Sequence, residues 1–250
     1  MTGAASRGGS RGLTVEFAGI PGAGKSRLVE AFAAGLGDRG VPVRQPQASL
    51  GPATPTGRRL ARKALASIAA TLAAPGTSAR AVGAIARSGQ PAAGDVAGRV
   101  VQWLVAQQVT ADARHSGAVS LVDEGVLQCL WSIGLRGDVA PVLSALAAHR
   151  VHRPDLVVVV RVPPEVALER LTARSSMHSR TQLLPASERL TELERGHRVL
   201  ERLVEWCSSG AAVPVLDVAG DDDGAGGRDA TLDRLATWWT TGRDPGAAAG

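Results

Sequence analysis

Short apolar runs separated by longer amphipathic segments make up most of the chain. The runs are rich in Val and Leu and are bounded by Gly, Pro or charged residues, a pattern that predicts buried strands. Unbroken runs such as LVVVV are typical of strands whose two faces are both covered. The predicted strands are LTVEFAG (13–19), VPVRQ (41–45), AVSLVDEG (118–125), PDLVVVVRV (154–162) and AVPVLDV (212–218).

Between these strands the apolar residues recur at helical spacing. Segments with this spacing are 26–36, most of 54–115, 129–135, 139–150, 163–174, 188–207 and 230–241. Strands that alternate with helices predict parallel βαβ units, and such sheets bind ligands at the carboxyl ends of their strands. The motifs GIPGAGKS, DEG and RVPPE all fall at such ends. We therefore expect one α/β domain over 13–242, with a disordered tail at 1–12 and a frayed end at 243–250.

Composition limits the cellular compartment and the binding partners that we expect for the protein. The chain has 250 residues, 44% of them apolar, and a net charge of +5. No apolar run reaches the roughly 18–20 residues of a membrane span, and the polar start lacks the apolar core of a secretory signal. Two cysteines make no disulfide framework. We expect a cytoplasmic protein with no membrane partner. Nucleic acid is a less favoured partner, because no basic groove interleaved with aromatic residues is visible.

Lysine is rare in this chain, and its placement is informative. Of 28 basic residues, only Lys25 and Lys63 are lysine. Lys25 stands in GAGKS, where a phosphate-binding loop requires a slim ammonium group and a planar guanidinium is a poor substitute.

The stretch GIPGAGKS matches G-x-x-x-x-G-K-[ST] between a predicted strand and a predicted helix. Gly22 and Gly24 allow the backbone around Ala23 to curl, so that consecutive N–H groups point at phosphate oxygens. The helix that follows adds its positive N-terminal end. We expect Lys25 to reach the β- and γ-phosphates of a nucleotide and the Ser26 hydroxyl to bind Mg²⁺.

The third predicted strand ends in Asp123 and Glu124. A carboxylate at this strand end can hold Mg²⁺ directly or through water, and this is the role we expect for Asp123. Glu124 is then available as a general base that accepts a proton from an acceptor hydroxyl. A cap on the helix that follows is the alternative role for one of the two acids.

Arginines follow the fourth predicted strand. Arg170 and Arg174 are four residues apart and share a helix face, and Arg180 follows in a polar loop. Phosphoryl transfer requires cations around the moving group, and mobile arginines that close over it also exclude water. We expect Arg174 to bind the nucleotide and, with Arg180, to act on the phosphoryl group. A solvated helix face, with Arg170 paired to Glu165 or Glu169, is the alternative.

With these motifs the chain resembles P-loop kinases of the nucleoside- and nucleotide-kinase group, most of all thymidylate-kinase-like proteins. The segment PDLVVVVRVPPEVALERLTAR carries much of the similarity, and TPTGRRLARKAL (54–65) carries a fainter one. The resemblance implies a P-loop NTPase fold with strand order 2-3-1-4-5 and helices on both faces. It also implies ATP and Mg²⁺ as cofactors, a LID-like loop at 174–186, and an acceptor site under the helical region 54–115.

Some positions depart from the thymidylate kinase pattern. Asp123-Glu124 stands where those proteins usually have Asp-Arg, and Arg161 stands where they have an acid. The stretch RQPQASLG (44–51) lacks their Glu and their paired glycines. An acid in place of arginine suits an uncharged acceptor hydroxyl that requires a base, such as that of a nucleoside. Arg161 could instead supply the cation for a charged acceptor.

The predicted helix 99–115 offers residues for the acceptor pocket. Trp103 and Gln107 are four apart and share a face, so the ring could stack on a base and the amide could bond its edge. A core Trp beside a surface Gln is the alternative. Arg44 and Gln47, just after the second strand, lie near the same site by topology.

Together these features predict an ATP-dependent phosphotransferase acting on a nucleoside, a nucleotide or a similar alcohol. The alternative is a P-loop ATPase that serves as a regulator or assembly factor and has no small-molecule acceptor. Trp238-Trp239 predicts a docked final helix, with a homodimer contact as the alternative.

Overall fold

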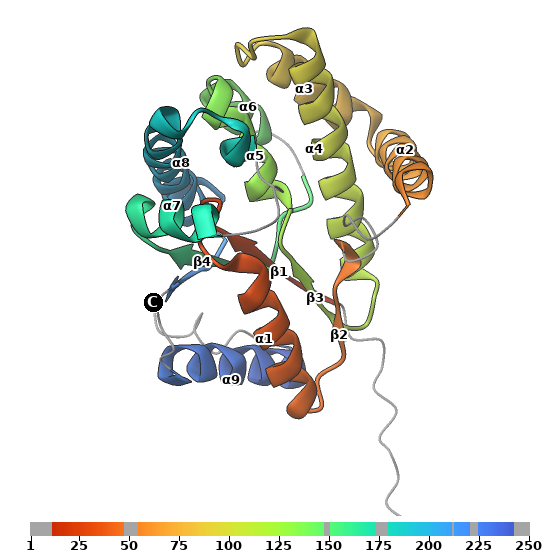
Figure 1. Cartoon of the computed structure of the whole chain (residues 1–250). Coiled ribbons are helices and arrows are strands. Elements are labelled where there is room, and N and C mark those ends of the chain that lie inside the picture. The colour runs from red at the N-terminus through yellow and green to blue at the C-terminus, as the bar shows by residue number, and fades with distance from the viewer. Residues whose placement is uncertain are drawn as a thin grey trace, which may run out of the picture.

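The structure, a computed structural model, describes residues 12–47, 55–147, 151–173, 180–211, 213–220 and 225–242. Its centre is a five-stranded parallel sheet in the order β2-β3-β1-β4-β5 (Figure 1). The strands are β1 (Leu13–Ala18), β2 (Val43–Arg44), β3 (Val119–Val122), β4 (Leu156–Arg161) and β5 (Val215–Ala219). This order confirms the predicted arrangement of the sheet, in which β1 lies between β3 and β4.

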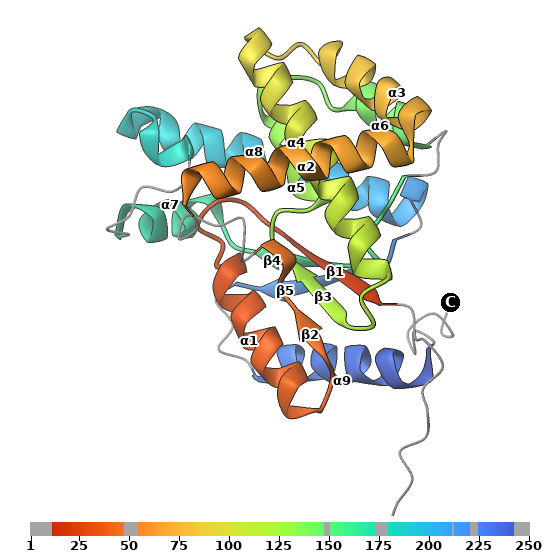
Figure 2. The same cartoon turned by 90° about the vertical axis from the view of Figure 1, so that its right-hand side faces the viewer.

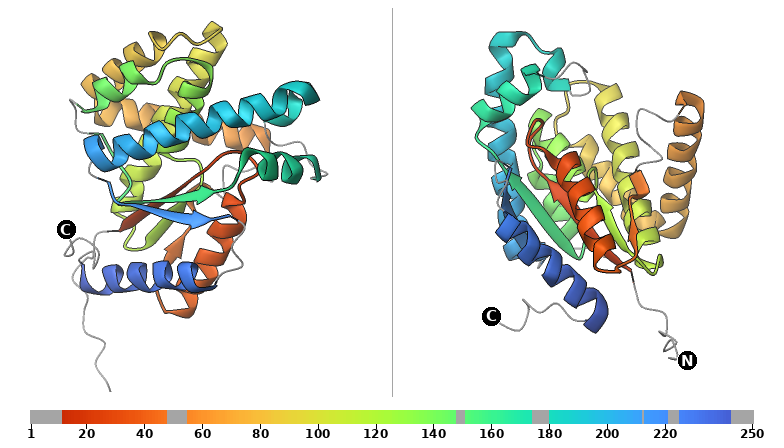
Figure 3. Two further views of the ribbon diagram at one scale, coloured as in Figure 1. Left: turned by 90° about the vertical axis from the view of Figure 1, so that its left-hand side faces the viewer. Right: turned by 60° about the horizontal axis from the view of Figure 1, so that its bottom comes forward.

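Helices cover both faces of the sheet (Figures 1 and 3). One face carries α1 (Lys25–Asp38) and α9 (Ala225–Thr241). The other carries α4 (Ala93–Arg114), α5 (Val126–Arg136) and α8 (Ala186–Trp206). Further helical segments are α2 (Thr56–Ala73), α3 (Pro75–Ala86), α6 (Ala140–Ala147), α7 (Pro164–Ala173), the 3₁₀ turn η2 (Arg180–Leu183) and the π-helical turn η3 (Cys207–Ala211).

An apolar core lies on each face of the sheet. Val158 of β4 packs into the core with Phe17 and Trp239, on the side of α1 and α9. Its neighbours Val157 and Val159 belong to the core on the opposite side. Because successive strand residues point to opposite faces and both are buried, β4 is apolar without alternation.

Helices α2, α3 and α4 form a helical layer on one side of the sheet (Figure 2). Within this layer α2 packs along α4, and α3 contacts both. Ala70 of α2 is buried there, whereas Leu65, Ile68 and Leu72 on the same helix are exposed. None of the helices in the described ranges is both long enough and apolar enough to cross a bilayer.

Several element boundaries differ from the predicted ones, including those of the second strand and of α8. The second strand keeps only Val43–Arg44, at the edge of the sheet. Helix α8 begins at Ala186, two residues before the predicted start, because Pro185 forms its N-cap and proline is well tolerated where a helix begins.

Three predicted features fall wholly or partly outside the described residues. The predicted disordered tail at its residues 1–11 and the predicted frayed end at 243–250 are not described, and neither are residues 174–179 of the LID-like loop. The last helix, α9, docks on α1 as predicted: Trp239 is buried, and Arg39 forms an ion pair with Asp233 at 2.8 Å.

Candidate functional site

The loop between β1 and α1 has the conformation that a phosphate-binding loop requires. Gly22 and Gly24 have φ values of +87° and +96°, in the left-handed region that favours glycine. A Cβ on Gly22 would lie 2.4 Å from the carbonyl oxygen of Ala167, so α7 packs too closely for any side chain. Gly24 is the N-cap of α1, which directs the N-terminus of that helix toward the loop.

Lys25 lies over this loop. Its Nζ donates to the carbonyl oxygens of Gly19 at 2.6 Å and Ile20 at 3.2 Å. These bonds hold the ammonium group on the side of the loop where the cavity opens, since Lys25 is among the cavity-lining residues.

The turn after β3 carries Asp123 and Glu124, and Gln47 ties it down. Gln47 Oε1 accepts hydrogen bonds from the backbone N–H groups of both acids, each at 3.0 Å. Gln47 Nε2 donates to the carbonyl oxygen of Glu124. Gln47, three residues after β2, thus restrains the backbone that carries the two carboxylates after β3.

The surroundings of Glu124 raise the pKa of its carboxyl group. Its side chain is exposed, but the surface that it presents belongs to a pocket, where protein replaces part of the surrounding water. This desolvation, with the like charge of Asp123, raises the pKa of Glu124 above its ordinary value, although Lys63 and Lys25 act in the opposite direction. Lys63, on α2, therefore contributes positive potential at Glu124.

A cavity of about 340 Å³ opens between the phosphate loop and the helical layer. Helices α4 and α5 form its wall opposite Lys25, Asp123 and Glu124. The wall residues on these helices are Arg99, Gln102, Gln128, Trp131, Ser132, Leu135 and Arg136. The wall combines an aromatic ring with amide, hydroxyl and guanidinium groups, as small-molecule sites commonly do.

Neighbouring side chains hold several wall residues in place. Arg99 Nη1 donates to Gln102 Oε1 at 2.7 Å. Arg136 forms an ion pair with Glu192 of α8 at 2.8 Å. An arginine can only donate, so the bond from Arg99 directs the Oε1 of Gln102 toward it and leaves the amide N–H groups for a ligand.

The structure corrects the predicted acceptor wall on α4. Trp103 is 1% exposed and belongs to the apolar core. Gln107 is buried, and its amide bonds the backbone of His152 in both directions, at 3.0 and 2.9 Å. The wall instead uses Gln102, which precedes Trp103, because one residue turns a helix by about 100°. Neither Trp103 nor Gln107 is among the cavity-lining residues.

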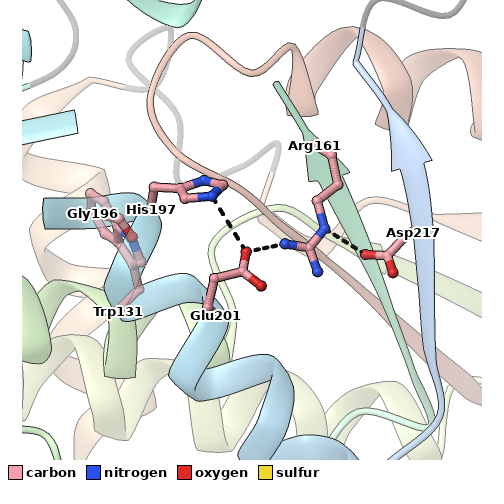
Figure 4. A network of polar contacts seen from close by, with 6 residues as sticks. All are labelled: Trp131, Arg161, Gly196, His197, Glu201 and Asp217. Atoms are coloured by element: carbon pink, nitrogen blue, oxygen red, sulfur yellow. Dashed lines mark hydrogen bonds and ion pairs between the residues drawn. The ribbon is translucent and has the colours of Figure 1, made fainter. Parts of the chain in front are cut away.

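The other two predicted acceptor residues also lie apart from the cavity lining. Arg161 points to the far edge of the sheet, where its guanidinium bonds Asp217 of β5 at 2.8 Å and Glu201 of α8 (Figure 4). Two carboxylates already neutralise this cation. Arg44 is exposed on the edge strand β2.

The predicted metal ligands come together. Ser26 and Asp123 line the main cavity and also an adjoining cavity of about 170 Å³. A hydroxyl and a carboxylate are hard oxygen donors that suit Mg²⁺, which in phosphoryl-transfer sites takes few protein ligands beside phosphate and water. In the described part of the chain, no three His, Cys, Asp or Glu side chains converge on one point.

The predicted arginines of the LID-like loop are described only in part. Arg174 lies outside the described residues. Arg180 begins η2, one residue before Thr181, which lines the cavity. Arg170 donates to the carbonyl oxygen of Gly220 at 3.2 Å, so it joins α7 to the end of β5.

A buried acid near the site was also not predicted. Glu16 lies in the middle of β1 and is 1% exposed. Burial raises its pKa to about 7, against the effect of hydrogen bonds from the backbone of residues 125–128. An acid inside an otherwise apolar strand flanked by strands is the sequence signal that could have revealed it.

Comparisons with known proteins show similarity in fold alone. No protein family matches the sequence, and no curated protein matches it either. Among solved structures, a deoxyadenosine kinase from M. mycoides with the products dCMP and a flexible dCDP bound is 11% identical, with a TM-score of 0.51 over 90% of this chain and 100% of that one. The same enzyme with bound dATP gives a TM-score of 0.48 at 12% identity, over 89% of this chain and 98% of that one. The chain therefore shares the fold of that deoxyadenosine kinase, with the predicted strand order.

Proposed function

We propose that the protein transfers the γ-phosphoryl group of ATP to a hydroxyl group of a small molecule, with nucleosides as the first class to test. The observation that carries this proposal is the cavity of about 340 Å³ that faces Lys25, Asp123 and Glu124. A regulator without an acceptor would have no need of this space. The fold shared with a deoxyadenosine kinase is the reason to begin with nucleosides.

The donor side follows from the loop and its helix. The backbone N–H groups of Gly22–Ser26 and the N-terminus of α1 bind the phosphates, and Lys25 neutralises their charge. Ser26 and Asp123 would hold Mg²⁺, which neutralises charge between the β- and γ-phosphates when bound. Arg174 and Arg180 would add positive charge around the transferring group.

On the acceptor side, Glu124 serves as the general base. The acceptor oxygen forms a bond to the γ-phosphorus while the bond from that phosphorus to the bridging oxygen of ADP breaks. The bridging oxygen keeps the electron pair, and the hydroxyl proton passes to Glu124. Gln102 and Arg99 on α4, with Trp131 on α5, orient the rest of the acceptor.

The test uses the full chain with ATP, Mg²⁺ and a panel of nucleosides, nucleoside monophosphates and unrelated alcohols. Phosphorus NMR and mass spectrometry are expected to show one class of acceptor gaining a phosphate group. Lys25→Ala is expected to abolish this transfer. If ATP is only hydrolysed to ADP and phosphate while every acceptor stays unmodified, the proposal is wrong. A P-loop ATPase that serves as a regulator or assembly factor then becomes the better hypothesis.

A further inference from the structure

The start of α5 is capped from another strand of the sheet. The first N–H groups of a helix have no partner within the helix. The N-cap of α5 is Gly125, and no side chain caps this end from within the helix. The Glu16 carboxylate takes that place: it accepts a hydrogen bond from Gln128 N at 3.0 Å and lies close to the N–H groups of Gly125, Val126 and Leu127.

Gly125 is shaped for this contact. A Cβ on Gly125 would lie 2.5 Å from the Glu16 carboxyl group, so only glycine lets the backbone approach so closely. On the strand side, Glu16 is paired with Val122 of β3, the residue before Asp123. Glu16 therefore contacts both ends of the short turn that carries the two site carboxylates.

The same turn is held from two directions. Gln47 binds the N–H groups of Asp123 and Glu124 from the side of β2. Glu16 binds the start of α5, which follows them, from the side of β1. Together these contacts leave the backbone between β3 and α5 little freedom to turn, and a displacement of about 1 Å at a reacting group can cost a hundredfold in rate.

We propose that Glu16 is a positioning residue for phosphoryl transfer, which caps α5 and thereby fixes the direction of Asp123 and Glu124. The catalytic consequence rests on the proposed function. Because the Glu16 carboxylate lies against the first turn of α5 and bonds Gln128 N, the N-terminus of α5 offers no open site for a phosphate. The anion site is left to α1, and α5 presents side chains alone to the acceptor.

The buried surroundings of Glu16 contain two other titratable groups, Cys129 on α5 and Cys207 of η3. Burial raises the pKa of each thiol to about 12, with Glu16 adding to the shift, so both are neutral near pH 7. The backbone N–H groups are thus the partners of the Glu16 carboxylate.

Glu16→Gln tests the proposal, because the amide keeps the shape but replaces one acceptor oxygen by an NH₂ group that faces N–H donors. The control is Thr14→Val, on the same strand two residues earlier and equally buried, whose hydroxyl makes no hydrogen bond within the described structure. Glu16→Gln is expected to lower kcat at least tenfold and to leave KM for ATP within about twofold, since α1 is untouched. Thr14→Val is expected to change neither value.

Amide hydrogen exchange supplies a readout that needs no acceptor. Residues 125–128 are expected to exchange at least tenfold faster in Glu16→Gln than in the natural protein and in Thr14→Val. Unchanged exchange overturns the cap, and faster exchange with unchanged kcat overturns the positioning role. If the natural protein phosphorylates no acceptor, the proposed function fails, while the exchange rates still decide whether Glu16 caps α5. Should Glu16→Gln fail to fold, Glu16→Asp, which keeps the charge on a shorter side chain, is expected to show intermediate exchange, and natural exchange rates there overturn the proposal.

Discussion

The Nε1–H of Trp131 donates to the carbonyl oxygen of Gly196 at 2.7 Å, in a buried contact between α5 and α8 (Figure 4). The contact depends on glycine, because a Cβ on residue 196 would lie 2.6 Å from Cζ2 of the indole. It holds the indole ring of Trp131, which lines the cavity.

Trp131→Phe keeps an aromatic ring and loses this donor. The Gly196 carbonyl keeps its hydrogen bond within α8 but loses the bond from the indole, and the smaller ring fills less of the buried site. Together these losses are expected to lower the free energy of unfolding by about 1–3 kcal/mol. Urea unfolding measures the change. Trp238→Phe, at a half-buried position on α9, is the control and is expected to cost less. Equal losses in the two variants would contradict the importance of the contact with Gly196.

The two glycines of the phosphate loop are expected to respond differently to alanine. Gly24→Ala meets open space, so its cost is the left-handed backbone alone, about 1–2 kcal/mol. Gly22→Ala meets the same strain and also the carbonyl oxygen of Ala167. Gly22→Ala is therefore expected to weaken ATP binding more, as titration with a fluorescent ATP analogue would measure. A weaker effect at Gly22 than at Gly24 would show that α7 moves to make room for the added methyl group.

Stability is expected to depend on pH through Glu16. Its pKa is raised from 4.5 to about 7 in the folded protein, so the folded state holds the proton more tightly than the unfolded chain. This contribution is fully present below pH 4.5 and is lost as pH rises through 7, and the whole shift amounts to about 3 kcal/mol.

Urea unfolding at pH values from 5 to 8 measures this dependence. The difference in unfolding free energy between the natural protein and Glu16→Gln isolates the contribution of Glu16, because other carboxylates titrate in both. The natural protein is expected to lose stability relative to the variant as pH rises. A constant difference would mean that Glu16 keeps its ordinary pKa.

Gln102 and Gln107 lie on the same helix, α4, but Gln102 lines the cavity and Gln107 is buried. Gln102→Ala is expected to raise KM for the acceptor about two- to tenfold, the value of one hydrogen bond, with little effect on stability. Gln107→Ala leaves the His152 backbone unpaired and is expected to cost about 1–3 kcal/mol in unfolding free energy. Steady-state kinetics and urea unfolding of both variants check the pair. If Gln107→Ala raised KM for the acceptor and Gln102→Ala did not, Gln107 would be the residue that contacts the acceptor.

Features contained in one contiguous stretch could be predicted well. The eight residues GIPGAGKS determine a loop by backbone geometry and helix position, and neither depends on distant parts of the chain. Strand order followed from the family resemblance, and the placement of Asp123 beside Ser26 followed from parallel strands that end at one edge.

Predictions that depended on the rotation of a helix were less secure. Trp103 and Gln107 share a face of α4, as predicted, but that face turns to the core and to the backbone of His152. The spacing of four residues shows that two side chains lie together, and it contains no information on what they face. Gln102, one position away, lines the cavity.

By itself, the sequence determined the phosphate loop, the parallel sheet and the acids at the end of β3, because local backbone chemistry and strand periodicity encode all of them. Only the tertiary structure decided which faces of α4 and α5 line the cavity, and that Glu16 bonds the start of α5 while Gln47 holds the turn before it. These contacts join residues far apart in the chain, 112 positions in the case of Glu16 and Gln128. Their geometry arises only when strands and helices pack, since packing sets the rotation of each helix and brings a buried carboxylate to a helix end.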